Sequence, residues 1–228
     1  MDFALQPPPV PTVAVSADGA FPVRRIFCVA RNYAEHAREM GSDPVREPPF
    51  FVTKPADAVV ASGALLAFPP RTANLHHEVE LVVAIGRGGA DIPADKVDGG
   101  HIFGYAVGID LTRRDLQAAA KAKGQPWDMA KGFDNSAPVG PISPLSRTGV
   151  MTRGKIELRV NGQVRQSGDI ADMIWHIPEI VQELSAFVAL AAGDLIFTGT
   201  PAGVGPVVRG DRLEARIDGL DPLTVGFA

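Results

Sequence analysis

Three acidic residues carry the clearest chemical signal in this sequence. Glu78 and Glu80 stand in Leu-His-His-Glu-Val-Glu-Leu-Val-Val-Ala-Ile-Gly, and Asp110 ends Phe-Gly-Tyr-Ala-Val-Gly-Ile-Asp. Because side chains alternate along a strand, we expect both glutamates on one face. Two like charges on a half-buried strand repel each other, and a bound divalent cation would remove that electrostatic cost. Because all the ligand atoms would be oxygens, Mg²⁺, Mn²⁺ or Ca²⁺ is favoured over zinc. Spacing alone leaves a solvated sheet face equally open, since one Glu-x-Glu pair is a weak motif.

A histidine and a glutamate offer acid–base chemistry nearer the N-terminus. His36 and Glu39 are three residues apart in an expected helix and therefore share a face. A carboxylate beside an imidazole orients the ring and raises its basicity, as in general base catalysis. The spacing by itself fits a mixed-charge surface helix better. The polar loop over residues 41–44 makes this segment a candidate lid.

Four further polar residues are candidates for contacting a substrate. Lys131, in Met-Ala-Lys-Gly-Phe-Asp, could neutralise negative charge developing on an oxygen. Arg114 and Gln117 share a face of the helix expected after Asp110, and both can donate to a carboxylate or keto oxygen. The glycine-rich loop around Thr200 lacks the ending of a nucleotide phosphate loop but could hold a small carboxylate. A solvated surface position is the alternative for the lysine and the helix pair.

Neighbouring residues are expected to support the site. His76 and His77 adjoin Glu78 but point to opposite faces of the strand, which favours hydrogen bonding around the ligands over ligation. Cys28 lies in an apolar run, so we expect a buried thiol.

Composition excludes several classes of function. The chain has 228 residues, 46% of them apolar, a net charge of −4 and only 7% aromatic residues, so a nucleic-acid partner is not expected. One cysteine cannot form an internal disulfide, which fits a reducing compartment. The N-terminus does not resemble a signal peptide, and no segment approaches the roughly 20 apolar residues that span a bilayer. We therefore expect a cytoplasmic protein without a membrane partner.

The pattern of elements predicts a β-rich α+β fold. Residues 1–20 should form an extended arm or a weak first strand, and residues 21–228 a single catalytic domain. Short apolar runs separated by Gly and Pro, without βαβ repeats, argue against a Rossmann sheet. Strands are expected at residues 23–30, 50–53, 65–68, 78–85, 102–109, 155–160, 163–166, 195–198 and 212–217, and helices at 32–40, 113–123 and from 178 to just before 193.

The order of these motifs resembles the fumarylacetoacetate hydrolase superfamily, in its short branch of acylpyruvate and fumarylpyruvate hydrolases. The resemblance runs from about residue 24 to residue 218. It rests on Cys-Val-Ala-Arg-Asn-Tyr-Ala-Glu-His-Ala-Arg-Glu-Met, Phe-Phe-Val-Thr-Lys-Pro, Leu-His-His-Glu-Val-Glu-Leu, Gly-Ile-Asp-Leu-Thr-Arg-Arg-Asp-Leu-Gln, Lys-Gly-Phe-Asp, Val-Asn-Gly and Phe-Thr-Gly-Thr-Pro-Ala-Gly-Val-Gly-Pro. Each motif is weak alone, but their joint order is specific. Gly132 departs from the pattern, since relatives commonly have Ser or Ala after the lysine.

The resemblance implies a mixed, rolled β-sandwich with few short helices, assembled as a homodimer. It implies Mg²⁺ or Mn²⁺ as cofactor and a catalytic dyad on a lid helix that orders when substrate binds. The implied metal ligands are Glu78, Glu80 and Asp110, the implied catalytic residues His36, Glu39 and Lys131, and the implied substrate contacts Arg114, Gln117 and Thr200.

The implied reaction is hydrolysis of the C–C bond of a 2,4-diketo acid, fumarylpyruvate or a related acylpyruvate, to pyruvate and a carboxylic acid in aromatic compound catabolism. Oxaloacetate decarboxylation or diketo-acid isomerisation at the same metal–enolate site is the alternative. The distal carboxylate of fumarylpyruvate needs a cation, for which Arg31, Arg38, Arg46 and Lys54 are candidates.

Overall fold

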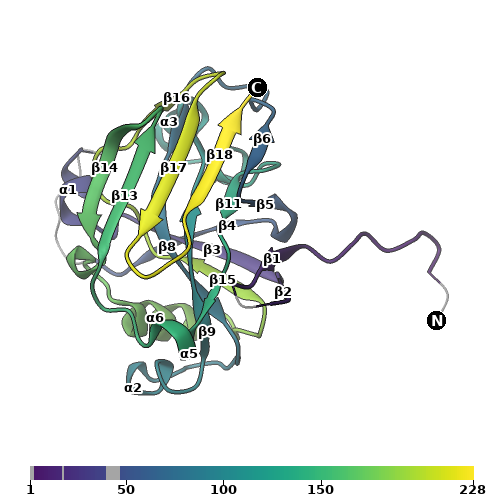
Figure 1. Cartoon of the computed structure of the whole chain (residues 1–228), viewed down its shortest axis with the longest axis vertical. Coiled ribbons are helices and arrows are strands. Elements are labelled where there is room, and N and C mark those ends of the chain that lie inside the picture. Colours follow the sequence, from purple (N-terminus) through teal and green to yellow (C-terminus); the bar gives the residue numbers. More distant parts are fainter. Residues whose placement is uncertain (1–2, 17, 40–46) are drawn as a thin grey trace.

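The computed structural model describes residues 3–16, 18–39 and 47–228, and for residues 37–39 it describes the backbone alone. Most of the body consists of two curled β-sheets, with short helices at their ends (Figure 1). This arrangement confirms the β-rich α+β fold and the rolled β-sandwich predicted from the sequence.

The larger sheet has eight strands and carries the candidate site. Two of its strand pairs are parallel and the others antiparallel, so the sheet is mixed. The strand order is β4 (Phe50–Lys54), β3 (Arg25–Ala30), β15 (Asp194–Phe197), β8 (Val79–Ile85), β9 (Ile102–Ile109), β11 (Ala137–Val139) and β5 (Val59–Ala61), with β12 (Ser143–Pro144) paired to β9.

Three smaller sheets complete the β-structure. The five-stranded sheet packs against β8 and β9, and the three-stranded sheet lies beside the candidate site. The five-stranded sheet has the order β14 (Gln163–Asp169), β13 (Lys155–Val160), β17 (Arg212–Ile217), β18 (Leu223–Phe227) and β6 (Ala64–Leu66). The three-stranded sheet has the order β10 (Thr112–Arg113), β7 (Leu75–His77) and β16 (Gly205–Val207). The third sheet is the pair β1 (Thr12–Ala14) and β2 (Ala20–Pro22).

The helices are short. None of those described is long and apolar enough to cross a bilayer. They are α1 (Ala34–Glu39), α2 (Ala94–Val97), α3 (Arg114–Ala122), α4 (Asp128–Lys131), α5 (Leu145–Thr148) and α6 (Ile177–Phe187), with 3₁₀ turns η1 (Ala56–Ala58) and η2 (Ile170–Asp172).

Strand β8 is buried on both faces, which explains its continuous apolar sequence. Leu81 and Val83 belong to the core between the two large sheets, whereas Val82 and Ala84 belong to a second apolar cluster on the other face. Because faces alternate along a strand, Glu80 shares the face of Val82 and Ala84. A carboxylate on that face must therefore find polar partners inside the protein.

The N-terminal segment begins as an extended chain that runs away from the body before β1 (Figure 1). Val13 of β1 and Phe21 of β2 are then buried against the second apolar cluster. The division into an arm over residues 1–20 and a catalytic domain over residues 21–228 stays a prediction.

Several predicted elements have the same bounds in the structure, namely β9, β13 and β17. The predicted hairpin turn is also confirmed, since Asn161 and Gly162 both have positive φ, 51° and 82°. The helix expected to reach residue 193 ends earlier, because Val188 turns the chain to an extended conformation. The strand expected at residues 78–85 begins at Val79, and the residues before it pair in a different sheet, which leaves Glu78 at the junction.

We predict that Gly108→Ala destabilises the sheet beneath the site. A Cβ here would lie 2.4 Å from Val82 Cγ2 and 2.7 Å from Phe197 Cε1, both buried. Because packed cores accommodate added methyl groups poorly, the free energy of unfolding should fall by about 1–3 kcal/mol, measured by chemical denaturation. Gly99→Ala is the control, since its Cβ meets nothing within 4 Å. Equal stability of the two variants would contradict this account of the packing.

Candidate active site

The three predicted metal ligands converge at one end of β8 and β9. Glu78 precedes β8, Glu80 lies on it, and Asp110 directly follows β9. The antiparallel register and a hydrogen bond from the Asp110 N–H to the Glu78 carbonyl (2.8 Å) bring them together. One carboxylate oxygen from each lies within 4.8 Å of the others, and all three side chains are buried. The expectation that both glutamates face the same way is confirmed.

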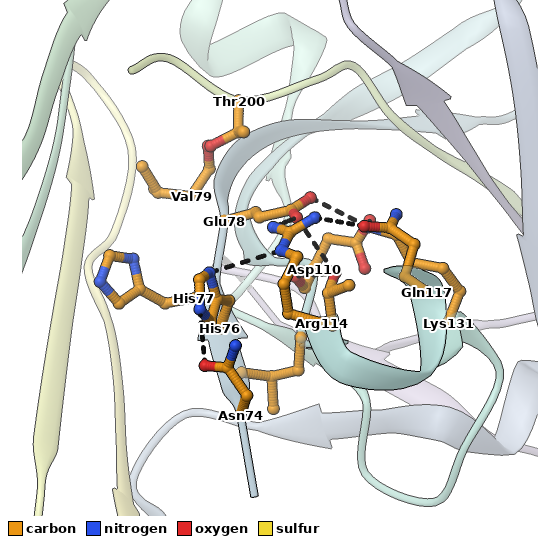
Figure 2. Close-up of polar contacts among 12 residues, drawn as sticks. Asn74, His76, His77, Glu78, Val79, Asp110, Arg114, Gln117, Lys131 and Thr200 are labelled. Carbon is orange, nitrogen blue, oxygen red and sulfur yellow. Dashed lines mark hydrogen bonds and ion pairs between the residues drawn. The ribbon is translucent and has the colours of Figure 1, made fainter. Parts of the chain in front are cut away.

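Basic side chains neutralise two of the three carboxylates. Lys131 Nζ lies 2.9 Å from Glu78 Oε2 and 2.6 Å from Asp110 Oδ2, so it bridges them. Lys54 Nζ lies 2.9 Å from Asp110 Oδ1. Arg114 pairs with Glu78 Oε1 (Figure 2). Burial would lower the pKa of Lys131, but Asp110 and Glu78 outweigh it and raise that pKa, so the ammonium stays charged.

Glu80 is the carboxylate without a basic partner. It accepts a hydrogen bond from the Gly199 N–H (2.7 Å), and no basic side chain of the described residues forms an ion pair with it. Burial, together with the charges of Asp110 and Glu78, raises its pKa well above the usual range. At Glu78, burial also raises the pKa, but Lys131 and Arg114 outweigh burial and lower it. The ionised form of Glu80 therefore has no ion-pair partner among the described residues, and burial beside two other carboxylates disfavours it.

The cluster fits a divalent cation. Its atoms are all carboxylate oxygens, the donor set that Mg²⁺ and Mn²⁺ prefer. Asp110 Oδ1 accepts no hydrogen bond although Lys54 Nζ is near, which leaves a buried lone pair. Among the described side chains, those of residues 3–16, 18–36 and 47–228, no other group of three or more His, Cys, Asp or Glu residues has this spacing.

A cavity of about 200 Å³ opens from the carboxylates. The described side chains predicted for the site all line it, although they come from five separate stretches of sequence. They are His36, Glu78, Glu80, Asp110, Arg114, Gln117, Lys131 and Thr200. For Glu39 the structure describes the backbone in α1, and its side chain lies outside the described atoms, so its pairing with His36 stays a prediction.

Helix α3 begins four residues after Asp110 and places two predicted substrate contacts. Arg114 Nη1 donates to Gln117 Oε1 at 2.5 Å, one turn along the same face. Arg114 Nε also donates to His76 Nδ1 at 3.4 Å, while His76 Nε2 lies 2.8 Å from Asn74 Oδ1 (Figure 2). Burial and the Arg114 charge lower the pKa of His76 to about 4, so the ring is neutral at pH 7 and can accept from the arginine.

Comparison with known proteins identifies the family. The fumarylacetoacetate (FAA) hydrolase C-terminal family model matches residues 25–227. The chain belongs to the fumarylacetoacetate hydrolase family.

Named relatives in this family carry two kinds of activity. A fumarylpyruvate hydrolase of Ralstonia sp. is 46% identical over 186 residues, 80% of this chain and 95% of the relative. A mitochondrial oxaloacetate tautomerase of Homo sapiens is 43% identical over 202 residues, 88% of this chain and 90% of the relative. The crystal structure of fumarylpyruvate hydrolase from Pseudomonas aeruginosa in complex with Mn²⁺ and pyruvate matches with a TM-score of 0.97 and 51% identity, covering 100% of this chain and 99% of that one.

In this member of the fumarylacetoacetate hydrolase family, Gln166 connects the site to the five-stranded sheet. Its Oε1 accepts from the Val79 N–H (3.1 Å) and lies 2.8 Å from His77 Nδ1. Its Nε2 donates to Thr200 Oγ1 (2.8 Å) and to the Pro201 carbonyl (2.9 Å). The Gln166 side chain thus fixes the backbone of Val79, the residue that separates Glu78 from Glu80 in the sequence.

The Thr200 hydroxyl has a backbone partner in this arrangement. It donates to the Val79 carbonyl at 2.7 Å, and its oxygen accepts from Gln166. The hydroxyl therefore stabilises the strand that carries the glutamates, and a contact between Thr200 and substrate stays a prediction. His77 points away from the cluster, which agrees with a supporting place for this histidine.

Lys54 supports the acidic cluster, and the prediction made for it from the sequence was wrong. We expected it among the cations for a distal carboxylate, but its ammonium is buried against Asp110 and donates to the carbonyls of Leu111 (3.0 Å) and Lys131 (2.5 Å). Its position at the end of an apolar strand, before Pro55, was the available sign of burial. Gln166 had no such sign, since it lies on a mostly polar strand.

Cys28 is buried, as predicted, and lines the cavity. Burial and the charge of Asp110 raise the pKa of its thiol. The thiol is therefore protonated at neutral pH, which disfavours a nucleophilic role.

We predict opposite effects of neutralising the two glutamates on the metal-free protein. Glu80→Gln should raise the free energy of unfolding at pH 7, because the folded-state pKa of Glu80 is raised and its ionisation opposes folding. Glu78→Gln should lower it by about 3 kcal/mol, because Lys131 and Arg114 lose a buried partner.

Denaturation in the presence of a chelator measures both changes, and calorimetric titration with Mn²⁺ should show that each variant binds the ion more weakly. Shifts of the same sign in the two variants would refute the assigned charge balance.

We predict that Gln166→Leu weakens Mn²⁺ binding although Gln166 is not a ligand. The variant removes four buried polar contacts around Val79 and Thr200, at a cost of about 2–4 kcal/mol in the free energy of unfolding. Gln163→Leu on the same strand is the control, since Gln163 is exposed. An unchanged Mn²⁺ dissociation constant in Gln166→Leu, measured on folded protein, would show that the strand needs no such support.

Proposed function

We propose that this protein is a metal-dependent hydrolase that cleaves the C–C bond of a 2,4-diketo acid, releasing pyruvate and a carboxylic acid. The observation that carries the proposal is the buried carboxylate cluster, bridged by Lys131, in a cavity that His36 also lines. Family members named fumarylpyruvate hydrolase, one of them crystallised with Mn²⁺ and pyruvate, support fumarylpyruvate or a related acylpyruvate as substrate. Such a reaction belongs to aromatic compound catabolism, and we expect a cytoplasmic homodimer.

The cofactor in this proposal is Mg²⁺ or Mn²⁺, held by Glu78, Glu80 and Asp110. Once bound, the ion supplies Lewis-acid stabilisation for negative charge on the keto acid. The protein's own contribution at this end is to fix the three carboxylates on two paired strands and to exclude water by burial.

His36 is the proposed base, oriented by Glu39. It takes a proton from water, and the resulting hydroxide attacks the 4-carbonyl carbon of the substrate. Lys131, whose raised pKa keeps it protonated, stabilises the oxyanion that forms. The C3–C4 bond then breaks, its electron pair passes to the pyruvate fragment, and a proton completes pyruvate.

Arg114, Gln117 and Thr200 are the proposed contacts to the pyruvate carboxylate. Arg114 and Gln117 line the cavity from one helix face beside Glu78. The Thr200 N–H makes no hydrogen bond with the described residues, whereas its hydroxyl is engaged, so the backbone donor is the one available.

Oxaloacetate chemistry is the second candidate, because relatives 43% identical are named oxaloacetate tautomerase. Decarboxylation or isomerisation at the same metal site would need no attacking water. The dependence on His36 therefore separates the two.

The test compares kcat/KM for fumarylpyruvate, acetylpyruvate and oxaloacetate with Mg²⁺ or Mn²⁺, in the wild type and in His36→Ala. We expect His36→Ala to lower kcat on fumarylpyruvate by about 10²–10⁴-fold while Mn²⁺ binding is retained, and a chelator to abolish turnover. Turnover of oxaloacetate alone, at a rate unaffected by His36→Ala, would overturn the hydrolase assignment.

A further inference from the structure

Two basic residues line the outer part of the cavity without a partner in the acidic cluster. Arg31 and Lys121 are both exposed, and neither forms an ion pair with a described residue. The other basic residues of the cavity wall, Arg114 and Lys131, neutralise buried carboxylates. Arg31 and Lys121 are thus cations that face the cavity and are available to a ligand.

Helix α3 sets the distance between the two ends of the cavity. Arg114, Gln117, Ala118 and Lys121 all line it, and their spacing of three, four and seven residues describes one helical face. At 1.5 Å per residue, Lys121 lies about 10 Å along the helix from Arg114. Arg114 contacts Glu78, so Lys121 marks the end remote from the metal ligands.

Arg31 faces the cavity from another wall because of an unusual backbone. It follows β3 directly and has φ of 60°, a conformation that a residue with a long side chain adopts only when its surroundings enforce it. Asn32 supplies that enforcement: its Nδ2 donates to the carbonyls of Trp175 (2.9 Å) and Thr198 (2.8 Å), and its Oδ1 accepts from the Trp175 N–H (2.7 Å).

The spacing suits a dicarboxylate of a definite length. In an extended seven-carbon diketo diacid, six C–C bonds separate the carboxylate carbons by about 7–8 Å. If one carboxylate of this diacid accepts hydrogen bonds from Arg114, the other lies close enough to accept one from Lys121. A four-carbon keto diacid, whose carboxylates are about 4 Å apart, cannot reach both ends.

We propose that Lys121 and Arg31 bind the distal carboxylate of the substrate and select acylpyruvates whose acyl chain ends in a carboxylate. The inference rests on the proposed function, because it takes the pyruvate moiety to lie at the carboxylate cluster. It assigns discrimination among substrates to two residues that take no part in the chemical step.

The test measures kcat and KM of Lys121→Met, Arg31→Met and the double variant with Mn²⁺ on fumarylpyruvate, acetylpyruvate and oxaloacetate. Each single variant should lower the ratio of kcat/KM for fumarylpyruvate to that for acetylpyruvate about tenfold, and the double variant roughly a hundredfold, because a charge-assisted hydrogen bond is lost each time. The loss should appear mainly in KM. Lys123→Met, at the C-cap directly after the same helix and outside the cavity wall, should leave the ratio at the wild-type value.

Oxaloacetate separates this inference from general charge attraction. If Lys121 merely attracts anions, Lys121→Met lowers kcat/KM equally for oxaloacetate and fumarylpyruvate, and the inference is overturned. An unchanged fumarylpyruvate-to-acetylpyruvate ratio in the double variant overturns it as well. Failure of the wild type to hydrolyse either acylpyruvate would instead refute the proposed function on which it rests.

Discussion

The burial of three adjacent carboxylates is the constraint on which the rest of the structure depends. A single buried carboxylate is costly without a partner, and three in contact also repel one another. The protein compensates unevenly: Lys54, Arg114 and Lys131 neutralise Asp110 and Glu78, whereas among the described residues Glu80 has only the Gly199 amide as a hydrogen-bond donor. The ion pairs stabilise the apoprotein, while the ionised form of Glu80, which has no basic partner among the described residues, gains the most from a bound cation. A fully neutralised cluster would fold more readily and bind an ion less well.

This compensation requires a particular place in the fold. The chain leaves the three-stranded sheet at β7 and enters the eight-stranded sheet at β8, so Glu78 lies between the two strands, beside Asp110, which directly follows β9. The backbone between the glutamates is then fixed from outside, its N–H by Gln166 and its carbonyl by Thr200. Because both clamps come from distant segments, the position of the ligands depends on the packing of the sheets and not on β8 alone.

The sequence could reveal what local geometry determines. Alternation along a strand placed Glu78 and Glu80 on one face, and helical spacing placed Arg114 beside Gln117, because both rules act over a few residues. The partners of Lys54 and Gln166 depend on which strands become neighbours, and a single sequence does not encode that register visibly. The break at Glu78 was hidden for a similar reason: residues 78–85 read as one strand, although strand β8 begins at Val79 and the residues just before Glu78 pair in another sheet. The rolled β-sandwich was predicted from the order of the sequence motifs, because hydrophobic periodicity predicts single strands and helices but not how they pack.

The two ends of the cavity differ in how freely they can change. At the inner end each side chain has buried partners, so altering one leaves another charge exposed to a low-dielectric interior, at a cost of several kcal/mol. At the outer end, Arg31 and Lys121 are exposed and form no ion pair with any residue that the structure describes. Exposed substitutions usually change stability by less than about 0.5 kcal/mol. In the proposed function, the 2-keto acid moiety binds at the inner end and the rest of the substrate reaches the outer end. Family members named for oxaloacetate and for fumarylpyruvate can therefore keep one inner end and differ at the other, since the fold places little thermodynamic constraint there.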